Sequence, residues 1–263
     1  LRPGHADYSA YVKYGGYSDR RGGGRSSGRI TAGFVMAGAV ARKLLGTIGI
    51  EIVAHTVEIG GVAAAPMAYT DVRKKTDADP LYCADPSASK RMNEIIAKAK
   101  QAGDSLGGII EGIALNVPAG LGEPVFDRLD GDLAKALLAI PSVKGVEFGA
   151  GFAATRIKGS ENNDAFVIQD GKISTATNNA GGILGGISSG MPVVVRVAVK
   201  PVSSIAMEQE TVDIKKMKKA GLKIEGRHDV CVVPRAVPVV EAMMAVTLCD
   251  FAMRAGMITR VIK

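Results

Sequence analysis

Hydrophobic residues recur with two different spacings along this chain, and the spacing changes from one segment to the next. Small and apolar residues dominate one face of residues 31–49, which predicts a helix that Thr31 caps and that Gly46 and Gly49 end. Residues 50–62 alternate between apolar and polar positions, as a strand does. His55 falls inside this strand, so a structural role is expected for it.

The same two patterns continue to the end of the chain. They predict helices within 88–105, where Gly103 closes the helix, within 127–140, where Pro141 stops it, and over 238–256. They predict strands within 106–122, shortly after Pro141, and within 193–206, where the strand ends at Pro201. Residues 159–192 are rich in Gly, Asn and Ser, which indicates a long functional loop. Strands and helices intermingle without a regular βαβ period, a repeat or a clean linker. We therefore expect one domain of mixed α and β structure over residues 1–263.

Composition narrows the range of partners. The chain has 263 residues, of which 47% are hydrophobic and 22% charged, as in an ordinary globular protein. Because no uninterrupted apolar run reaches roughly 18 residues, no membrane partner is expected. The net charge of +7 favours anionic partners but does not choose between a phosphorylated metabolite and a polynucleotide. The absence of tryptophan weighs against nucleic-acid stacking, and the lysine run at 213–223 is expected to be a solvated helix or loop face.

Three cysteines, Cys83, Cys231 and Cys249, show no paired metal-ligand spacing, and no metal is expected. Cys231 and Cys249 lie in apolar contexts and are expected to be small buried hydrophobic residues, which fits a reducing cytoplasm.

A glycine-rich stretch, Gly15 to Gly33, holds four arginines just before the first predicted helix: Arg20, Arg21, Arg25 and Arg29. Freed backbone amides, guanidinium groups and a helix N-terminus can together hold an anion such as phosphate. The glycine spacing fits neither a Walker loop nor a dinucleotide-binding fingerprint. From the residues alone, a phosphate site and a solvated basic loop remain equally good interpretations.

Three further segments carry polar chemistry. His5 of "RPGHAD" follows Pro3 and Gly4, and a histidine can transfer protons at neutral pH. Asp229 of "GRHDVCVVPRAVP" follows Arg227 and His228 and could act as a base. The glycines of "TNNAGGILGGISSG" could let backbone approach a planar ligand. Taken alone, the segments of His5 and Asp229 are more often exposed surface, and a flexible surface loop is an equally good interpretation of the glycine-rich segment.

Taken together and in order, the motifs "RPGHAD", "GGGRSSGR", "GDSLGG", "VKGVEFGAGF", "GSENND", "NNAGGILGGISSG", "VAVKPVSS" and "GRHDVCVVPRAVPVVEAM" resemble the chorismate synthase family from the first residue to the final helix. The resemblance implies an α+β fold, a β-α-β sandwich with central helices between antiparallel sheets. It also implies a cytoplasmic homotetramer and a phosphate-eliminating lyase of aromatic amino acid biosynthesis. That lyase converts 5-enolpyruvylshikimate 3-phosphate to chorismate with reduced FMN. The NADP-linked flavin reduction of bifunctional members is left open.

The resemblance also implies roles for particular residues. His5 and Asp229 match the family's catalytic positions, and Arg2 and Arg227 match substrate contacts. The positions that match flavin contacts are Arg25, Ser26, Ser27, Pro141, Ser142, Gly185, Lys200, Pro201, Val202, Ser203, Ser204 and Arg227. The arginines of the Gly15–Gly33 stretch are accordingly expected to serve phosphate groups.

The chain departs from the family pattern in two respects. Gly28, Ile30 and Phe34 stand where the family has Ala, Glu and a substrate-binding Arg. The family also carries a "GESHG" motif and further arginines ahead of "RPGHAD", which leads us to expect an N-terminally incomplete domain. Loss of one charge-assisted hydrogen bond costs about 1.5–3 kcal/mol. We therefore expect weakened substrate binding and impaired catalysis, with a flavin- or phosphate-binding fragment or paralogue as the alternative function.

Overall fold

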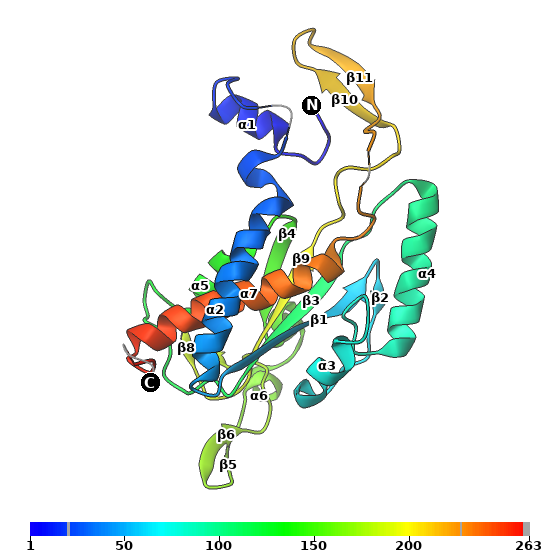
Figure 1. The fold of residues 1–263 in the computed structure, drawn as a ribbon. Coiled ribbons are helices and arrows are strands. Elements are labelled where there is room, and N and C mark those ends of the chain that lie inside the picture. Colours follow the sequence, from blue (N-terminus) through cyan, green and yellow to red (C-terminus); the bar gives the residue numbers. More distant parts are fainter. Residues whose placement is uncertain (20–21, 227, 260–263) are drawn as a thin grey trace.

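The computed structural model describes residues 1–19, 22–226 and 228–259 (Figure 1). The α-helices are α1 (Asp7–Lys13), α2 (Thr31–Gly46), α3 (Tyr69–Thr76), α4 (Pro86–Ala102), α5 (Leu129–Leu138), α6 (Gly159–Asn162) and α7 (Val233–Arg254). Three short 3-10 helices are η1 (Gly24–Ser26), η2 (Gly28–Ile30) and η3 (Gly151–Arg156). The strands are β1 (Glu51–Ile59), β2 (Val62–Ala63), β3 (Gly108–Leu115), β4 (Val143–Phe148), β5 (Phe166–Gln169), β6 (Lys172–Thr175), β7 (Ile183–Leu184), β8 (Ile187–Ser188), β9 (Val193–Val199), β10 (Gln209–Asp213) and β11 (Lys218–Leu222).

One sheet of five strands organises the described residues. Its order is β2-β1-β3-β9-β4, and every neighbouring pair is antiparallel. The remaining strands form three separate two-stranded sheets: β5–β6, β7–β8 and β10–β11. The expected α+β class, with helices and antiparallel sheets, is confirmed; in the described ranges one large sheet carries the core.

Helix α7 packs on one face of this sheet, and α2 crosses α7 on its outer side (Figure 1). The helices approach closely because Gly38 of α2 has no side chain, and a Cβ there would collide with Ala242. Gly112 of β3 has the same role under α7, where a Cβ would meet Met244. The resulting core includes fully buried side chains from several elements: Leu45, Ile110, Leu133, Val195, Met244 and Leu248.

Helix α7 is long and apolar enough to cross a membrane by length and composition, and 67% of its most apolar window is buried inside the protein. It lies between the sheet, α2 and α5. Its apolar surface is therefore accounted for by the core of the protein.

The main elements occur where the hydrophobic pattern predicts them. Gly103 ends α4 with φ = 71°, a left-handed conformation that suits glycine. At the start of α2, the predicted cap is wrong: the N-cap residue is Ile30, and the Thr31 hydroxyl donates to the Gly28 carbonyl oxygen at 2.6 Å. The preceding turn η2 supplies the local hydrogen bonds instead, so the chain enters α2 without a side-chain cap.

Two segments differ from expectation in their local structure. Residues 159–192 form α6 and the hairpins β5–β6 and β7–β8, rather than one continuous loop. The lysine run forms the hairpin β10–β11, which stands out from the molecule beside the N-terminus (Figure 1). In both places a short turn with a residue at positive φ, Asp170 or Met217, lets two brief strands pair.

His55 and Cys249 are buried as expected, whereas Cys231 is half-buried. The His55 Nε2 atom lies 3.1 Å from Glu111 Oε1 on the neighbouring strand, within the sheet. Its role there is structural, as the alternating pattern predicts. All three thiols are free.

Candidate active site

The candidate site lies at the edge of the sheet where β9 ends and β3 and β4 begin. Val199 pairs with Gly108 on one side and with Val143 on the other. Because the strands are antiparallel, the segments that precede β3 and β4 and the segment that follows β9 meet at this edge. The Lys200 backbone N–H donates to the Ser142 carbonyl oxygen at 2.9 Å, which joins two of these segments. Ser142 has φ = 73°, an uncommon conformation for a residue with a side chain.

The N-terminal loop is attached to the same edge by a chain of hydrogen bonds. Lys200 Nζ donates to Ser203 Oγ at 2.5 Å, and Ser203 Oγ donates to the Gly4 carbonyl oxygen at 2.8 Å. Ser204 Oγ lies 3.1 Å from His5 Nε2. Gly4 has φ = 71°, and a Cβ there would lie only 2.7 Å from Ser203 Oγ. Only glycine therefore fits this contact, which brings together His5, Lys200, Ser203 and Ser204, four of the residues singled out in the sequence.

Arg2 and Asp7 hold the N-terminal loop in shape. The Arg2 guanidinium donates from Nε and Nη2 to the two carboxylate oxygens of Asp7, at 2.9 and 2.8 Å. The Arg2 backbone N–H donates to the same carboxylate at 2.9 Å. These hydrogen bonds lower the pKa of Asp7 to about 2. Arg2 thus closes the loop around His5, in addition to the substrate contact that the resemblance implies.

The surroundings of His5 favour its neutral form. Burial lowers the pKa of His5 below its usual value, and the charges of Arg2, Lys200 and His228 lower it further, while Asp7 acts in the opposite direction. Burial likewise lowers the pKa of Lys200, with a smaller contribution from Lys144.

A third segment, residues 228–231, is held at the same edge. The Leu106 backbone N–H donates to the Val230 carbonyl oxygen at 2.8 Å, and Ser105 Oγ donates to the Val202 carbonyl oxygen at 2.7 Å. Ser105 and Leu106, which are adjacent in the chain, thus hold the segment after β9 and residues 228–231 next to each other. Asp229 accepts a hydrogen bond from Arg235 Nη1 at 2.8 Å, in the first turn of α7. The sequence reasoning gave Ser105 no role, because a single serine before a strand carries no recognisable chemistry; its contact with Val202 depends on the fold.

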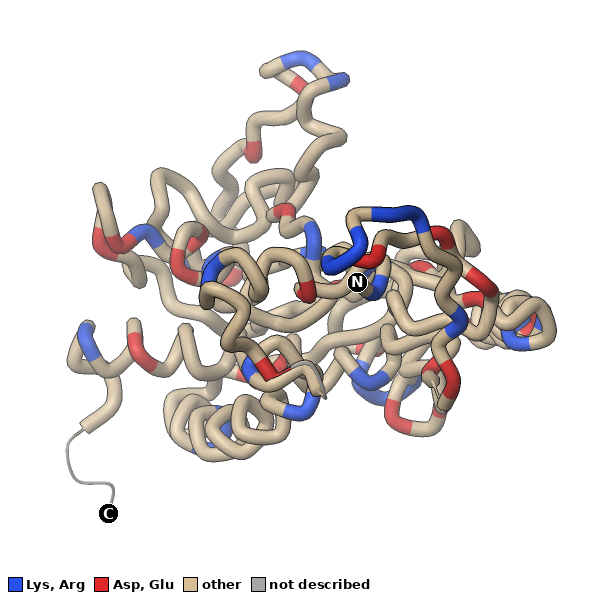
Figure 2. Tube along the Cα trace, turned by 90° about the horizontal axis from the view of Figure 1, so that it is seen from above, with Lys and Arg blue, Asp and Glu red and all other residues tan. Residues whose placement is uncertain are grey.

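The predicted flavin segment Arg25–Ser27 lies before α2, at the end of the molecule that carries the N-terminus and β10–β11 (Figure 1). Arg25 is exposed, and its guanidinium carbon lies 5.9 Å from the centre of the Tyr14 ring. Ser27 Oγ accepts the Arg29 backbone N–H at 3.3 Å. Figure 2 looks down on this end and shows basic segments close to the N-terminus.

Gly185 lies elsewhere, in the turn between β7 and β8. The neighbouring Gly186 carbonyl oxygen accepts the backbone N–H of Leu129, the first residue of α5, whereas Ser142 follows the other end of this helix. A ten-residue helix is about 15 Å long. Within the described parts of the chain, Gly185 is therefore separated from the His5 group by the length of α5.

Arg227, Arg20 and Arg21 fall outside the described residues. Of the three departures, Gly28 is exposed and Ile30 is 37% exposed. Phe34 is half-buried and packs against the main core. The side chain at this position therefore contributes to packing rather than to a cationic surface.

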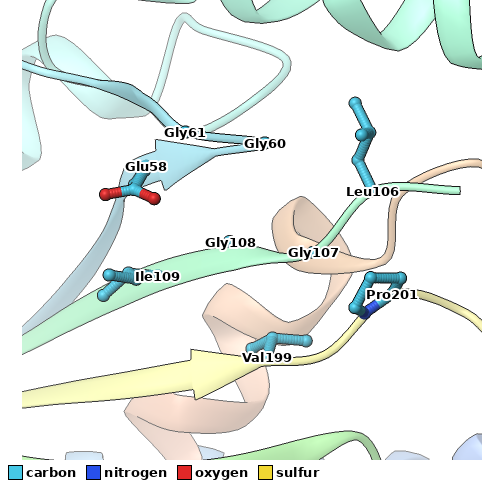
Figure 3. Close-up of a pocket in the computed structure, with 9 residues that line it drawn as sticks. All are labelled: Glu58, Gly60, Gly61, Leu106, Gly107, Gly108, Ile109, Val199 and Pro201. Carbon is cyan, nitrogen blue, oxygen red and sulfur yellow. The ribbon is translucent and has the colours of Figure 1, made fainter.

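An open pocket of about 350 Å³ lies next to Pro201 (Figure 3). It is lined mainly by backbone at the end of β1, the start of β3 and the end of β9. Glu58 is the one charged residue in its lining. Because a carboxylate repels anions, the cationic group around Lys200 is the better candidate for a phosphate site.

The chain is similar to known proteins along its length. The family model described as chorismate synthase matches residues 1–253. A chorismate synthase of Dehalococcoides mccartyi is 59% identical over all of this chain and 72% of its own length. One of Methanosarcina mazei is 53% identical over 98% of this chain and 70% of its own. A crystal structure of chorismate synthase superposes with a TM-score of 0.78 at 32% identity, covering 95% of this chain and 70% of that one. The chain belongs to the chorismate synthase family.

Proposed function

We propose that this chain acts as the family does in the shikimate pathway, as a lyase that eliminates phosphate from 5-enolpyruvylshikimate 3-phosphate to give chorismate, with reduced FMN as cofactor. The observation that carries the proposal is the convergence of His5, Lys200, Ser203 and Ser204 at one sheet edge. These residues come from the two ends of the chain, and they offer an ammonium group, hydroxyls and an imidazole to a phosphorylated ligand.

The donor set fits a flavin phosphate. Lys200 supplies a cation whose burial is only partial, and the Ser204 hydroxyl lies beside His5 in the same group. Ser203 orients the Lys200 ammonium, because its hydroxyl accepts from Nζ and donates to the Gly4 carbonyl oxygen. The bare backbone at Gly4 allows the N-terminal loop to lie directly against this group. We propose that the flavin-binding residues are Arg25, Ser26, Ser27, Pro141, Ser142, Gly185, Lys200, Pro201, Val202, Ser203, Ser204 and Arg227, with Arg2 and Arg227 contacting substrate.

In this reaction one carbon–hydrogen bond and one carbon–oxygen bond break, so a proton and a phosphate leave the substrate. When bound, reduced FMN supplies electron density to the substrate ring as phosphate departs. His5, held neutral by its surroundings, exchanges a proton at Nε2, the atom beside Ser204 Oγ. Asp229, oriented by Arg235, accepts the proton lost from the ring. Lys200 neutralises phosphate charge.

A second candidate function is binding of FMN or phosphate with impaired catalysis. Phe34 favours it, because this side chain packs against the core where the family has a substrate-binding arginine. The same substrate phosphate would then be held by fewer cations.

We further infer that residues 1–263 fold as a single domain and that the protein assembles as a homotetramer in the cytoplasm. One main hydrophobic cluster draws on α2, the central sheet, α4, α5 and α7, which supports a single folding unit. The three free thiols suit a reducing compartment. The small-molecule substrate follows from the enzyme family.

The test is a titration of the purified protein with FMN under anaerobic reduction, with and without the shikimate phosphate substrate, followed by absorbance. Saturable binding that tightens with substrate and yields chorismate is the expected result. Binding without chorismate would favour the second candidate, and no saturable binding would contradict both. Lys200→Gln should weaken FMN binding, whereas Lys172→Gln in the exposed β6 strand is the matched control.

A further inference from the structure

His228 carries an imidazole nitrogen that the rest of the site leaves without a partner. Its Nε2 atom is shielded from solvent and has no hydrogen-bond partner among the residues that the structure describes. A buried polar atom of this kind costs free energy unless a ligand satisfies it. The neighbouring Asp229 does not serve it, since that carboxylate pairs with Arg235.

The position of His228 places this atom in the candidate site. His228 lies near enough to His5 for its charge to contribute to the lowered pKa of His5, although the two residues are 223 positions apart in the sequence. The Leu106–Val230 hydrogen bond fixes the loop just after His228. The Ser105–Val202 hydrogen bond fixes the segment that carries Ser204, the partner of His5. Because Ser105 and Leu106 are adjacent, they hold the segment after His228 and the segment that contacts His5 at the same edge of the sheet.

The ring of His228 is also positioned by its own loop. Gly226 has φ = 136°, and a Cβ there would lie 3.4 Å from both Cε1 and Nε2 of His228. The imidazole therefore lies over bare backbone, at van der Waals distance. Its position leaves Nε2 buried, without the protein supplying a described partner for it.

We propose that His228 contacts the bound ligand, with Nε2 donating a hydrogen bond to a phosphate monoester oxygen in the anion site shared with His5 and Lys200. The inference rests on the proposed function and deepens it. An imidazole N–H donates a hydrogen bond to an oxyanion, as an ammonium group does. The phosphate can belong to FMN or to the substrate, since both present the same oxygens.

The chain's three histidines allow a direct test, because they give three sets of imidazole signals in a histidine-labelled protein. His5→Asn and His228→Gln assign two of them. His55, buried and paired with Glu111, is the internal reference. The probes are inorganic phosphate, the shikimate phosphate substrate, FMN, and riboflavin, which lacks the phosphate.

The expected result is that FMN or the substrate, and inorganic phosphate at higher concentration, shift the His228 signals, while riboflavin leaves them in place and His55 stays fixed with every probe. A response to FMN but not to the substrate identifies the phosphate as that of the flavin, and the reverse response identifies that of the substrate. An equal response to riboflavin and FMN would overturn the proposal, since contact would then be to the ring system.

Binding by variants gives a second readout. His228→Leu should raise the Kd of the phosphate ligand about tenfold, the loss of one charge-assisted hydrogen bond. His228→Gln keeps an N–H donor and should recover part of that affinity, with an unchanged urea midpoint in both variants. If FMN binds saturably while the His228 signals stay in place with every phosphate probe, this inference fails and the proposed function stands. If FMN does not bind at all, both fail.

Discussion

Strand β9 and the segment that directly follows it are held in place by different kinds of interaction. Along the strand, Val193, Val195 and Val197 are fully buried under α7, and their environment is set by apolar packing. Immediately beyond it, Lys200, Ser203 and Ser204 have polar contacts with residues from the other end of the chain. A few residues therefore separate a region that stabilises the fold from the proposed ligand site.

The difference teaches where mutations should act. Apolar packing is shared among many atoms, so its loss appears as a lower free energy of unfolding. The site depends on single hydrogen bonds between distant segments. A change there should alter binding and leave most of the stability in place.

The sharpest test of this division is His5→Ala. Loss of a proton-transferring group is expected to reduce chorismate formation by about 10²–10⁴-fold. The free energy of unfolding should stay close to that of the parent, because His5 lies outside the main core. Ser204→Ala is the control: it removes the hydroxyl beside the ring but keeps the ring, and only a few-fold loss is expected. Residual activity above a tenth in His5→Ala would contradict the assigned role.

Leu248→Ala should produce the opposite pattern. This side chain is fully buried in α7, so its truncation should cost about 2–5 kcal/mol of unfolding free energy. Urea denaturation measures the effect, and FMN affinity measured on the folded fraction should change little. Leu138→Ala, at a side chain that is 51% exposed, should cost far less. Equal losses in the two variants would refute the packing argument.

Gly4→Ala tests the contact between the N-terminal loop and Ser203. The left-handed backbone costs a residue with a Cβ about 1–2 kcal/mol, and the Cβ would press on Ser203 Oγ. We expect weaker FMN binding, by about tenfold, in isothermal titration. Gly171→Ala is the matched control, since Gly171 also has a left-handed backbone, with φ = 75°, and a Cβ there meets no atom within 4 Å. An unaltered affinity in Gly4→Ala would show that the loop does not shape the site.

The smallest expected effect concerns the Arg2–Asp7 pair and acid. The pKa of Asp7 is lowered to about 2 in the folded protein, from its usual value of 3.8. The pair therefore stabilises the fold above pH 4, and this contribution is lost as the pH falls from 4 towards 2. Because the pair is partly exposed, we expect about 1 kcal/mol or less. Urea midpoints measured across this range should fall less steeply in Asp7→Asn, and parallel curves would contradict the argument.

The sequence pattern predicts the fold well where periodicity is strong. Helices α2, α4 and α7 and strands β1, β3 and β9 follow from apolar spacing, which tertiary packing then reinforces. The hairpins β5–β6 and β10–β11 were not predicted, because their strands are only four or five residues long and their composition is that of loops.

The site is predictable only in part. Motifs identify His5, Lys200 and Ser203 as candidate site residues. That they lie close together depends on the antiparallel pairing at the end of β9, which the motifs do not show. The Ser105–Val202 hydrogen bond and the unpartnered nitrogen of His228 cannot be predicted from neighbouring residues in the sequence, because both depend on the fold. Nor does the sequence show that the length of α5 lies between Gly185 and the group around His5. The roles of the individual residues stay predictions.

The hydrogen bond from Ser203 to Gly4 joins residues 199 positions apart. During synthesis, the N-terminal loop therefore leaves the ribosome long before its partner exists. Closing so long a loop carries an entropic cost, which is met only after β9 has joined the sheet. The ability to bind ligand should consequently arise late in folding. In a pulse-labelling experiment, a nascent chain halted before residue 200 would lack Lys200, Ser203 and Ser204 of the site, and also α7, whose buried side chains complete the core.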